Sequence, residues 1–339
     1  MGATFSATYD STVVREDLSD VITIMTPTDL PLTSLLDEES CHDVYFDWAV
    51  DELPTPTAVA SVAENATLSY AAGAEVVRLK AGCGINTNTV QVADTRRVVT
   101  EAGYDDAYNY QLWKQSVATM KQAEFNNHWG YEAAEVTTAV ARIPTGVLAW
   151  GLQTFWDEPI SGVATGTYGS YKPTFQNGSG ADMTRDDLHD ILQNGYTNGM
   201  NIGGSVALCG AKMKRIISAM AMVYANGTSR RNISVASKAW GETIDFFESD
   251  FGEIAINLDR YMDGTTSVSW NATGGPTSVV FEDAFIVIEP ERFHRMILRG
   301  LGHVPIAKDG DSTKGLCVIE SGIKCDNMLA CTGGWDQAA

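Results

Sequence analysis

Residues 15–36 read REDLSDVITIMTPTDLPLTSLL, a stretch with two short apolar stripes separated by prolines. The first stripe has the i, i+3, i+4, i+7 spacing of one helix face and consists of Leu18, Val21, Ile22 and Met25. The second stripe follows Pro27 and Pro31 and consists of Leu32, Leu35 and Leu36. Helices this short are not stable alone, so the segment must dock on its own core or on a neighbouring subunit. We expect the second arrangement, in which these residues contact another subunit.

The composition fits a globular chain with little affinity for nucleic acid. The 339 residues suffice for two or three domains or one elaborate domain, and 44% of them are hydrophobic. With 43 acidic and 23 basic residues, the net charge is −20, which argues against wrapping nucleic acid or lying on an anionic membrane. Enclosing DNA without binding it remains compatible with this charge. No segment approaches the roughly 20 apolar residues of a membrane span and the N-terminus does not resemble a signal peptide, so we expect synthesis in a cytoplasm.

Residue types that carry enzyme chemistry do not gather into a recognisable motif. The sequence has no phosphate-binding loop, zinc-binding helix, nucleophile elbow or calcium loop. Its six cysteines lack CxxC spacing and are expected to be reduced, small apolar residues, and its five histidines are isolated. We therefore predict no catalytic residue, no cofactor and no metal site.

Two pairs of basic residues are candidates for contacts between subunits. They are Arg96 with Arg97 and Arg230 with Arg231. In a chain this acidic, paired arginines are among the few groups able to bind carboxylates in bidentate fashion across an interface. For either pair taken alone, a simple solvated charge is the alternative interpretation.

A long hairpin is predicted between residues 41 and 94. His42–Val50 alternates in side-chain type and indicates a strand, with its partner expected within Val76–Val92. Residues 54–67 between them are small and weakly charged, which is typical of an extended tip. A hairpin of this length is marginal alone, so we expect it to lie across an adjacent subunit.

One long helix is predicted from Thr95 to about Trp129. No proline interrupts this range, and Gly103 is its only glycine. Two apolar stripes lie on different sides, Tyr104, Tyr108 and Leu112 on one and Trp113, Val117 and Met120 on the other. The helix is therefore contacted on two faces, either in a core or in an assembly.

Residues 183–310 have the mixed pattern of an α+β domain. Thr184 is a candidate N-cap for a helix that ends near Gly195. The other expected elements are a strand at Val206–Cys209, a helix at Lys212–Met222, and strands at 242–247, 253–258, 279–288 and 294–298. Residues 143–182 are expected to be mainly loop, and the tail at 315–329 to return to the sheet beside the long helix.

With these parts in this order, the chain resembles the major capsid proteins of tailed bacteriophages, which have the Hong Kong 97-type fold. A second block, DFFESDFGEIAINLDRYM at residues 245–262, supports the resemblance together with the first. The colinear matching stretches are 15–36, Asp47–Trp48, 151–153, 212–218, 245–262, 289–293 with Arg299, and 307–311.

The resemblance implies a division of the chain and a set of partners. Residues 1–40 would be an N-terminal arm, 41–94 an extended E-loop, 95–182 with 311–339 a peripheral domain, and 183–310 an axial domain. The subunit would form pentamers and hexamers of an icosahedral or prolate shell that encloses DNA without sequence-specific binding and contacts no membrane. Further partners would be portal, scaffolding and decoration proteins, and the location would be the virion, after synthesis in a bacterial host.

Two other function classes are compatible with the sequence. An unrecognised α+β hydrolase or transferase would form monomers or small closed oligomers and have a deep pocket with perturbed ionisable groups. A secreted adhesin or surface-layer protein is disfavoured by the lack of a signal peptide.

Overall fold

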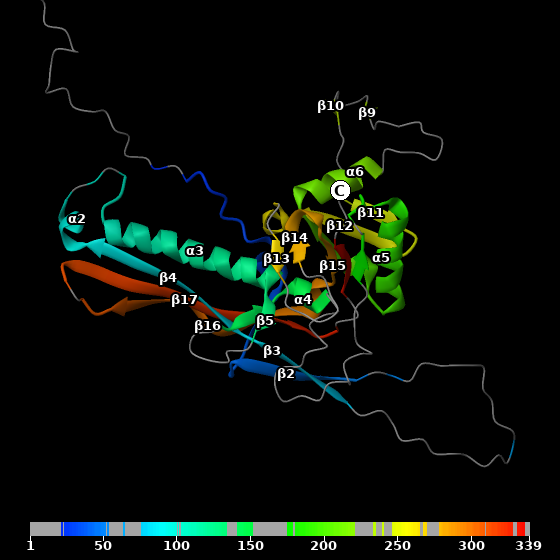
Figure 1. Cartoon of the computed structure of the whole chain (residues 1–339), viewed down its shortest axis with the longest axis horizontal. Helices are drawn as coiled ribbons and strands as arrows, with labels where there is room; N and C mark the ends of the chain where they lie inside the picture. The colour runs from blue at the N-terminus through cyan, green and yellow to red at the C-terminus, as the bar shows by residue number, and fades with distance from the viewer. Residues whose placement is uncertain are drawn as a thin grey trace, which may run out of the picture.

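The structure is a computed structural model with an elongated part, a compact part and an extended hairpin (Figure 1). It describes residues 22, 24–51, 53, 64, 76–99, 101, 103–133, 141–151, 175–178, 180–220, 233–234, 239–240, 246–264, 267–269, 278–308, 310–327 and 331–335. Both helices and antiparallel strands contribute, which confirms the predicted α+β class.

The elongated part consists of a long helix, α3 (Ala107–Trp129), lying along a four-stranded sheet (Figure 1). The strand order is β1 (Asp37–Ser40), β16 (Phe293–Ile306), β17 (Ser312–Cys325) and β4 (Gly84–Ala93). Strand β17 pairs antiparallel with both β16 and β4, so the predicted return of the tail beside the long helix is confirmed. A small apolar core, Val90, Val92, Ala107, Tyr108 and Cys317, lies between helix and sheet.

The predicted helix over 95–129 is wrong in its first third. The chain instead forms a short helix, α2 (Asp94–Val98), and begins α3 at Ala107. Gly103 has φ 91°, a left-handed conformation that ends helices, and the Asp106 carboxylate then caps α3 by accepting from the backbone N–H of Tyr108. The predicted end at Trp129 is confirmed.

The compact part has a six-stranded sheet in the order β11, β12, β8, β15, β18, β7, together with helices α5 and α6 (Figure 1). The strands are β11 (Phe246–Ser249), β12 (Gly252–Leu258), β8 (Val206–Cys209), β15 (Phe285–Ile288), β18 (Thr332–Trp335) and β7 (Phe175–Asn177). The predicted strand at Val206–Cys209 is therefore confirmed. Apolar side chains of α5, α6 and the sheet form a common core that includes Ile191, Met213, Ile217, Ile254 and Phe285.

Helix α5 (Arg185–Thr197) begins with a capping box in which the Thr184 and Asp187 side chains bond each other's backbone N–H groups. This confirms the N-cap prediction, although the helix continues past Gly195 and the chain turns at Gly199, where φ is 84°. Helix α6 (Ala211–Met220) confirms the second predicted helix within the described residues, and the predicted end at Met222 lies outside them.

Two strand predictions differ from the structure. The strand expected over 279–288 is split into β14 (Ser278–Val280) and β15 by a 3-10 turn, η6 (Phe281–Asp283). Strand β16 continues to Ile306 because it pairs with β17 along its whole length, which places 293–306 in the four-stranded sheet and not with the rest of 183–310. Strand β18, near the end of the chain, lies in the six-stranded sheet of the compact part.

The structure describes the base of the predicted hairpin. Strand β2 (Tyr45–Val50) pairs antiparallel with β3 (Val77–Gly82), and Figure 1 shows the pair leaving the body below the four-stranded sheet. The expected tip at 54–67 lies outside the described residues except for Glu64.

The remaining described elements are α1 (Pro31–Leu35), β5 (Tyr131–Ala133), β6 (Ile143–Thr145), α4 (Val147–Gly151), η4 (Ile202–Gly204), β9 (Ile233–Ser234), β10 (Ala239–Trp240), η5 (Arg260–Met262), β13 (Ser267–Ser269) and η7 (Pro290–Arg292).

Candidate assembly interface

The described part of the arm runs without helix as far as Leu30. The helix predicted through Ile22 and Met25 is therefore wrong at its C-terminal end, while Leu18 and Val21 lie outside the described residues. Pro27 disfavours a helical conformation at the residue before it, which is consistent with the extended course. Met25 is 96% exposed, so the arm presents an apolar side chain to solvent.

A groove separates this arm segment from the outer face of α3. Its volume is 350 Å³. Its apolar lining comes from Ile22, Ile24 and Met25 on the arm and from Tyr110, Trp113, Val117 and Ala118 on α3. The Lys121 ammonium donates to the carbonyl oxygen of Pro27 at 3.1 Å, which fixes one end of the arm against the helix. The second predicted stripe of the helix, which contains Trp113 and Val117, thus faces the arm.

Helix α1, the second stripe of the arm, docks in its own chain. Leu32 is 0% exposed and Leu36 is buried beside it in the main core, and Leu35 is partly buried against the same core. The sequence predicted a contact with another subunit for Leu32 and Leu35, whereas the structure packs both against the core of their own chain. Because Leu32 has no exposed surface, it supports the fold of its own subunit.

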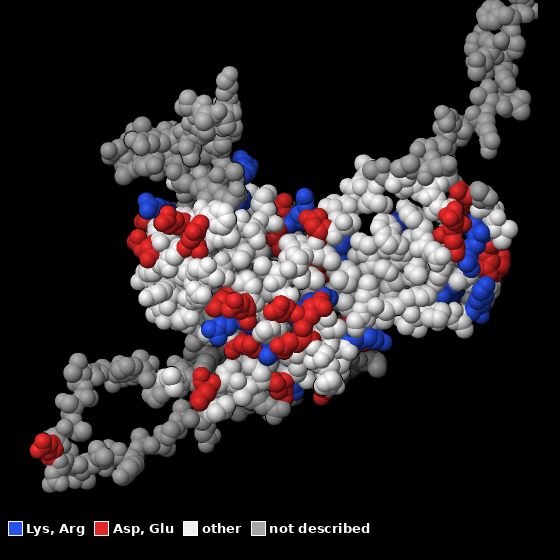
Figure 2. Space-filling view, turned by 180° about the vertical axis from the view of Figure 1, so that it is seen from behind, with Lys and Arg blue, Asp and Glu red and all other residues white. Residues whose placement is uncertain are grey.

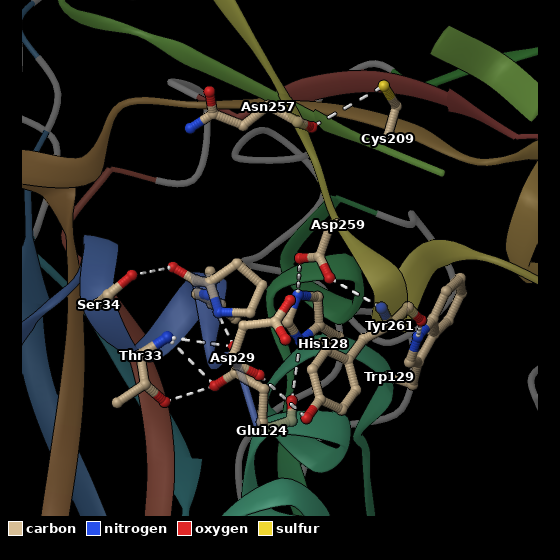
Figure 3. Close-up of polar contacts among 12 residues, drawn as sticks. Asp29, Thr33, Ser34, Glu124, His128, Trp129, Cys209, Asn257, Asp259 and Tyr261 are labelled. Carbon is tan, nitrogen blue, oxygen red and sulfur yellow. Dashed lines mark hydrogen bonds and ion pairs between the residues drawn. The ribbon is translucent and has the colours of Figure 1, made fainter. Parts of the chain in front are cut away.

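A buried carboxylate from α3 holds the start of α1 (Figure 3). Leu30 occupies the N-cap of α1 and has no side-chain acceptor, so the first N–H groups of that helix need a partner from elsewhere. Glu124, which is fully buried, accepts from the Leu32 N–H at 2.7 Å and from the Thr33 N–H at 3.1 Å. The Thr33 hydroxyl donates to the same carboxylate. Glu124 therefore replaces the missing cap from 92 residues away.

One turn further along α3, His128 joins this cluster to the compact part. The His128 Nδ1 donates to the Glu124 carbonyl oxygen at 2.8 Å, and its Nε2 lies 2.5 Å from Asp259 Oδ2 (Figure 3). With Nδ1 already carrying a proton, a second donation from Nε2 to the carboxylate makes the ring a cation. Burial alone disfavours that charge, but the hydrogen bond and negative charge of Asp259 outweigh it and raise the pKa of His128.

Asp259 also fixes the start of the following 3-10 turn. Its Oδ1 accepts from the Tyr261 N–H at 2.8 Å, and the Tyr261 ring stacks on His128. On the solvent side, Arg260 bonds the Asp29 carboxylate of the arm at 2.9 Å. The cluster of Glu124, His128 and Asp259 therefore connects the arm, the long helix and the compact part, and we call it the arm junction.

The pair of Arg96 and Arg97 binds carboxylates of its own chain. Arg96 bonds the Glu101 carboxylate at 2.8 Å, and Arg97 makes a bidentate contact with Asp106 at 3.0 and 3.2 Å. The carboxylate pairing expected between subunits is thus made within the chain for this pair. The guanidinium groups lower the pKa values of Glu101 and Asp106 through these hydrogen bonds. Arg230 and Arg231 lie outside the described residues.

The surface is acidic in several places. Figure 2 shows Asp and Glu side chains in groups across one face, with Lys and Arg beside or between them. Within the described part of the chain, no group of His, Cys, Asp and Glu has the arrangement of a metal site. The helices described there are too short or too polar to cross a membrane.

The residues of the arm junction were missed by sequence reasoning. His128 was treated as isolated, although Glu124 and His128 stand at i, i+4 on one face of a predicted helix and a polar pair there is a usable signal. Asp259 lies in the quoted block at 245–262 but has no local feature that indicates its partner. Chemically, the cluster is suited to holding elements in place, since its polar groups are engaged with one another and with backbone.

Comparisons with known proteins agree with this organisation. A family model described as SU10 major capsid protein matches residues 2–333. Similar solved structures include the cyanophage A-1(L) capsid asymmetric unit, with 10% identity, a TM-score of 0.68, and coverage of 96% of this chain and 98% of that chain. Another is the capsid of a native GTA particle, with 14% identity, a TM-score of 0.62, and coverage of 99% and 100%. No curated protein sequence matches this chain.

Proposed function

The chain belongs to the SU10 major capsid protein family, and on that premise we propose how this subunit of a tailed-phage head assembles. Its fold is of the Hong Kong 97 type, its role in the virion shell is structural, and it acts in many copies. We propose that these copies form hexamers and pentamers. In that arrangement the compact part, with α5, α6 and the six-stranded sheet, lies near the capsomer centre.

The elongated part would then form the outer region of each capsomer. The four-stranded sheet and α3 make a stiff rod, and the β2 and β3 hairpin extends from its base (Figure 1). We propose that the outer part of this hairpin lies across an adjacent subunit. Its base is held in its own chain, because Phe46, Leu79 and Ala81 belong to the main core, but β2 and β3 pair in a two-stranded sheet with no further strand beside them among the described residues.

The observation that carries the assembly proposal is the apolar groove between the arm and α3. Met25 and Trp113 line it, and Trp113 is 47% exposed. Large apolar side chains that remain exposed along one groove are typical of a surface covered by a partner. In a self-assembling shell, the occupant is a neighbouring copy of this chain, and the arm residues Leu18 and Val21 are proposed to extend the same contact.

Truncation of the arm tests this proposal. Because Leu32 and Leu36 belong to the core, the deletion must stop before α1 and remove residues 1–28 only. We expect the truncated subunit to stay folded, as judged by circular dichroism and a cooperative unfolding transition, while shell formation in electron micrographs is lost. Shells of normal size and yield from the truncated protein would show that the arm is not an assembly element.

A point variant with a matched control distinguishes the loss of a contact in the groove from the general effect on assembly of removing an exposed apolar side chain. Met25→Ser removes an exposed apolar side chain from the groove, whereas Val98→Ser removes one that is 86% exposed on α2, outside the groove. We expect assembly to weaken only for Met25→Ser. Equal assembly of the two variants would contradict a contact at Met25.

A further inference from the structure

Two buried cysteines face each other where the hairpin joins the body of the subunit. Cys41 directly follows β1 and Cys83 lies between β3 and β4. Their Sγ atoms are 3.4 Å apart, and the side chains are 8% and 0% exposed. All six cysteines are buried as free thiols in this structure, and Cys325 and Cys331 form a second pair that is close enough to interact electrostatically.

Backbone hydrogen bonds hold both cysteines in this position. The Cys41 N–H donates to the Ile297 carbonyl of β16 at 3.0 Å, and the Cys83 N–H donates to the Val44 carbonyl at 2.9 Å. Cys41 is therefore attached to the four-stranded sheet, and Cys83 to the chain entering β2. The packing around Cys83 is close, since a Cβ atom on Gly84 would lie 2.3 Å from Pro144. Both cysteines also border strands of the four-stranded sheet, β1 before Cys41 and β4 after Cys83, so this sheet keeps the two sulfur atoms together.

We propose that Cys41 and Cys83 form a modification site, oxidised to an intrachain disulfide that fastens the base of the hairpin to the body of the subunit. The oxidant is a small disulfide such as oxidised glutathione. One thiolate attacks it to give a mixed disulfide and a released thiol, and the second cysteine then displaces the other half. An Sγ–Sγ bond replaces two S–H groups, and the oxidant leaves as two reduced thiols.

Burial of the two thiols makes this reaction slow, so the subunit can assemble before the disulfide forms. Burial raises the pKa values of both Cys41 and Cys83, so the thiols are protonated near neutral pH and attack only during local opening. Inside a cell, thiol buffers keep such a pair reduced. The timing, though not the chemistry, rests on the proposed function: a shell released from its host meets an oxidising medium.

Thiol mapping of the full-length protein tests the proposal. Unassembled subunits and shells, purified with reductant, are incubated with oxidised glutathione, quenched in acid, denatured, alkylated and digested. We expect one cross-linked peptide pair containing Cys41 and Cys83, with loss of two alkylatable thiols, and the other four cysteines alkylated as free thiols. The reaction should proceed faster as pH rises, because the attacking thiolate becomes more abundant.

Variants assign the link and its consequence. Cys41→Ala and Cys83→Ala should each abolish the cross-linked peptide, whereas Cys209→Ala, which removes a buried thiol elsewhere, should leave it unchanged. Amide exchange at the described residues of β2 and β3 should slow on oxidation of the wild type and not of Cys41→Ala. If both thiols stay free while the urea-unfolded chain oxidises, or if another pair links instead, the assignment is wrong. Because unassembled subunits are oxidised and mapped in parallel with shells, a failure of the protein to form shells is distinguished from a failure of Cys41 and Cys83 to link.

Discussion

Replacing Glu124 by alanine should release the arm from the long helix. Glu124 is the acceptor for the Leu32 and Thr33 N–H groups and for the Thr33 hydroxyl, and it has no exposed surface. A hydrogen bond to a charged group contributes about 1.5–3 kcal/mol, and the unpartnered Leu32 N–H left behind costs about 1–3 kcal/mol more. Removing the energetic cost of a buried carboxylate offsets part of this loss. We therefore expect unfolding free energy to fall by about 2–4 kcal/mol.

The assay is urea denaturation of unassembled full-length subunits, followed by amide exchange at Leu32 and Thr33. Gln122→Ala is the matched control, because this residue is exposed on the same helix and its removal should change stability by less than about 0.5 kcal/mol. Glu124→Gln keeps one carbonyl acceptor, so its free energy of unfolding should fall by less than that of Glu124→Ala. The capping argument would be refuted if Glu124→Ala stayed within about 1 kcal/mol of the wild type with unchanged exchange at both amides.

Three further outcomes follow from the junction, the hairpin and the net charge. The pKa of His128 is raised in the folded state, so the stability it contributes is complete below about pH 6.5 and is lost as pH rises through the folded value, by at most about 1.4 kcal/mol per pH unit. In urea titrations from pH 6 upwards, His128→Gln should lack this decline, and an identical slope in the variant would contradict it. Amides of the expected hairpin tip at 54–67 should exchange rapidly in isolated subunits and slowly in shells, and equal protection would argue against a contact with a neighbour. Empty shells, with a net charge of −20 per subunit, should bind duplex DNA weakly near physiological salt, and tight, strongly salt-dependent binding would contradict this.

Several features of the chain were predictable because their causes lie within a few residues. The capping box at Thr184 and Asp187 is local, as are the alternation in β2 and the stop of α3 at Trp129 before Gly130. Strand β8 is a short apolar run bounded by turn residues and was placed correctly. The order of these elements, together with dispersed matching stretches, was enough to indicate the fold class and the family.

The sequence alone determined the class of protein and those helices and strands whose limits are set by neighbouring side chains, such as α5 with its capping box and the apolar strand β8. Tertiary structure alone decided which distant groups meet. Glu124 caps a helix 92 residues earlier, β16 extends because β17 pairs with it, and Cys41 faces Cys83. It also decided that Leu32 is core while Met25 is exposed, although both lie in apolar stripes of one arm. An apolar stripe indicates that one face of a segment must be covered. The surface that covers this face comes from remote parts of the chain, so it depends on how the whole chain packs.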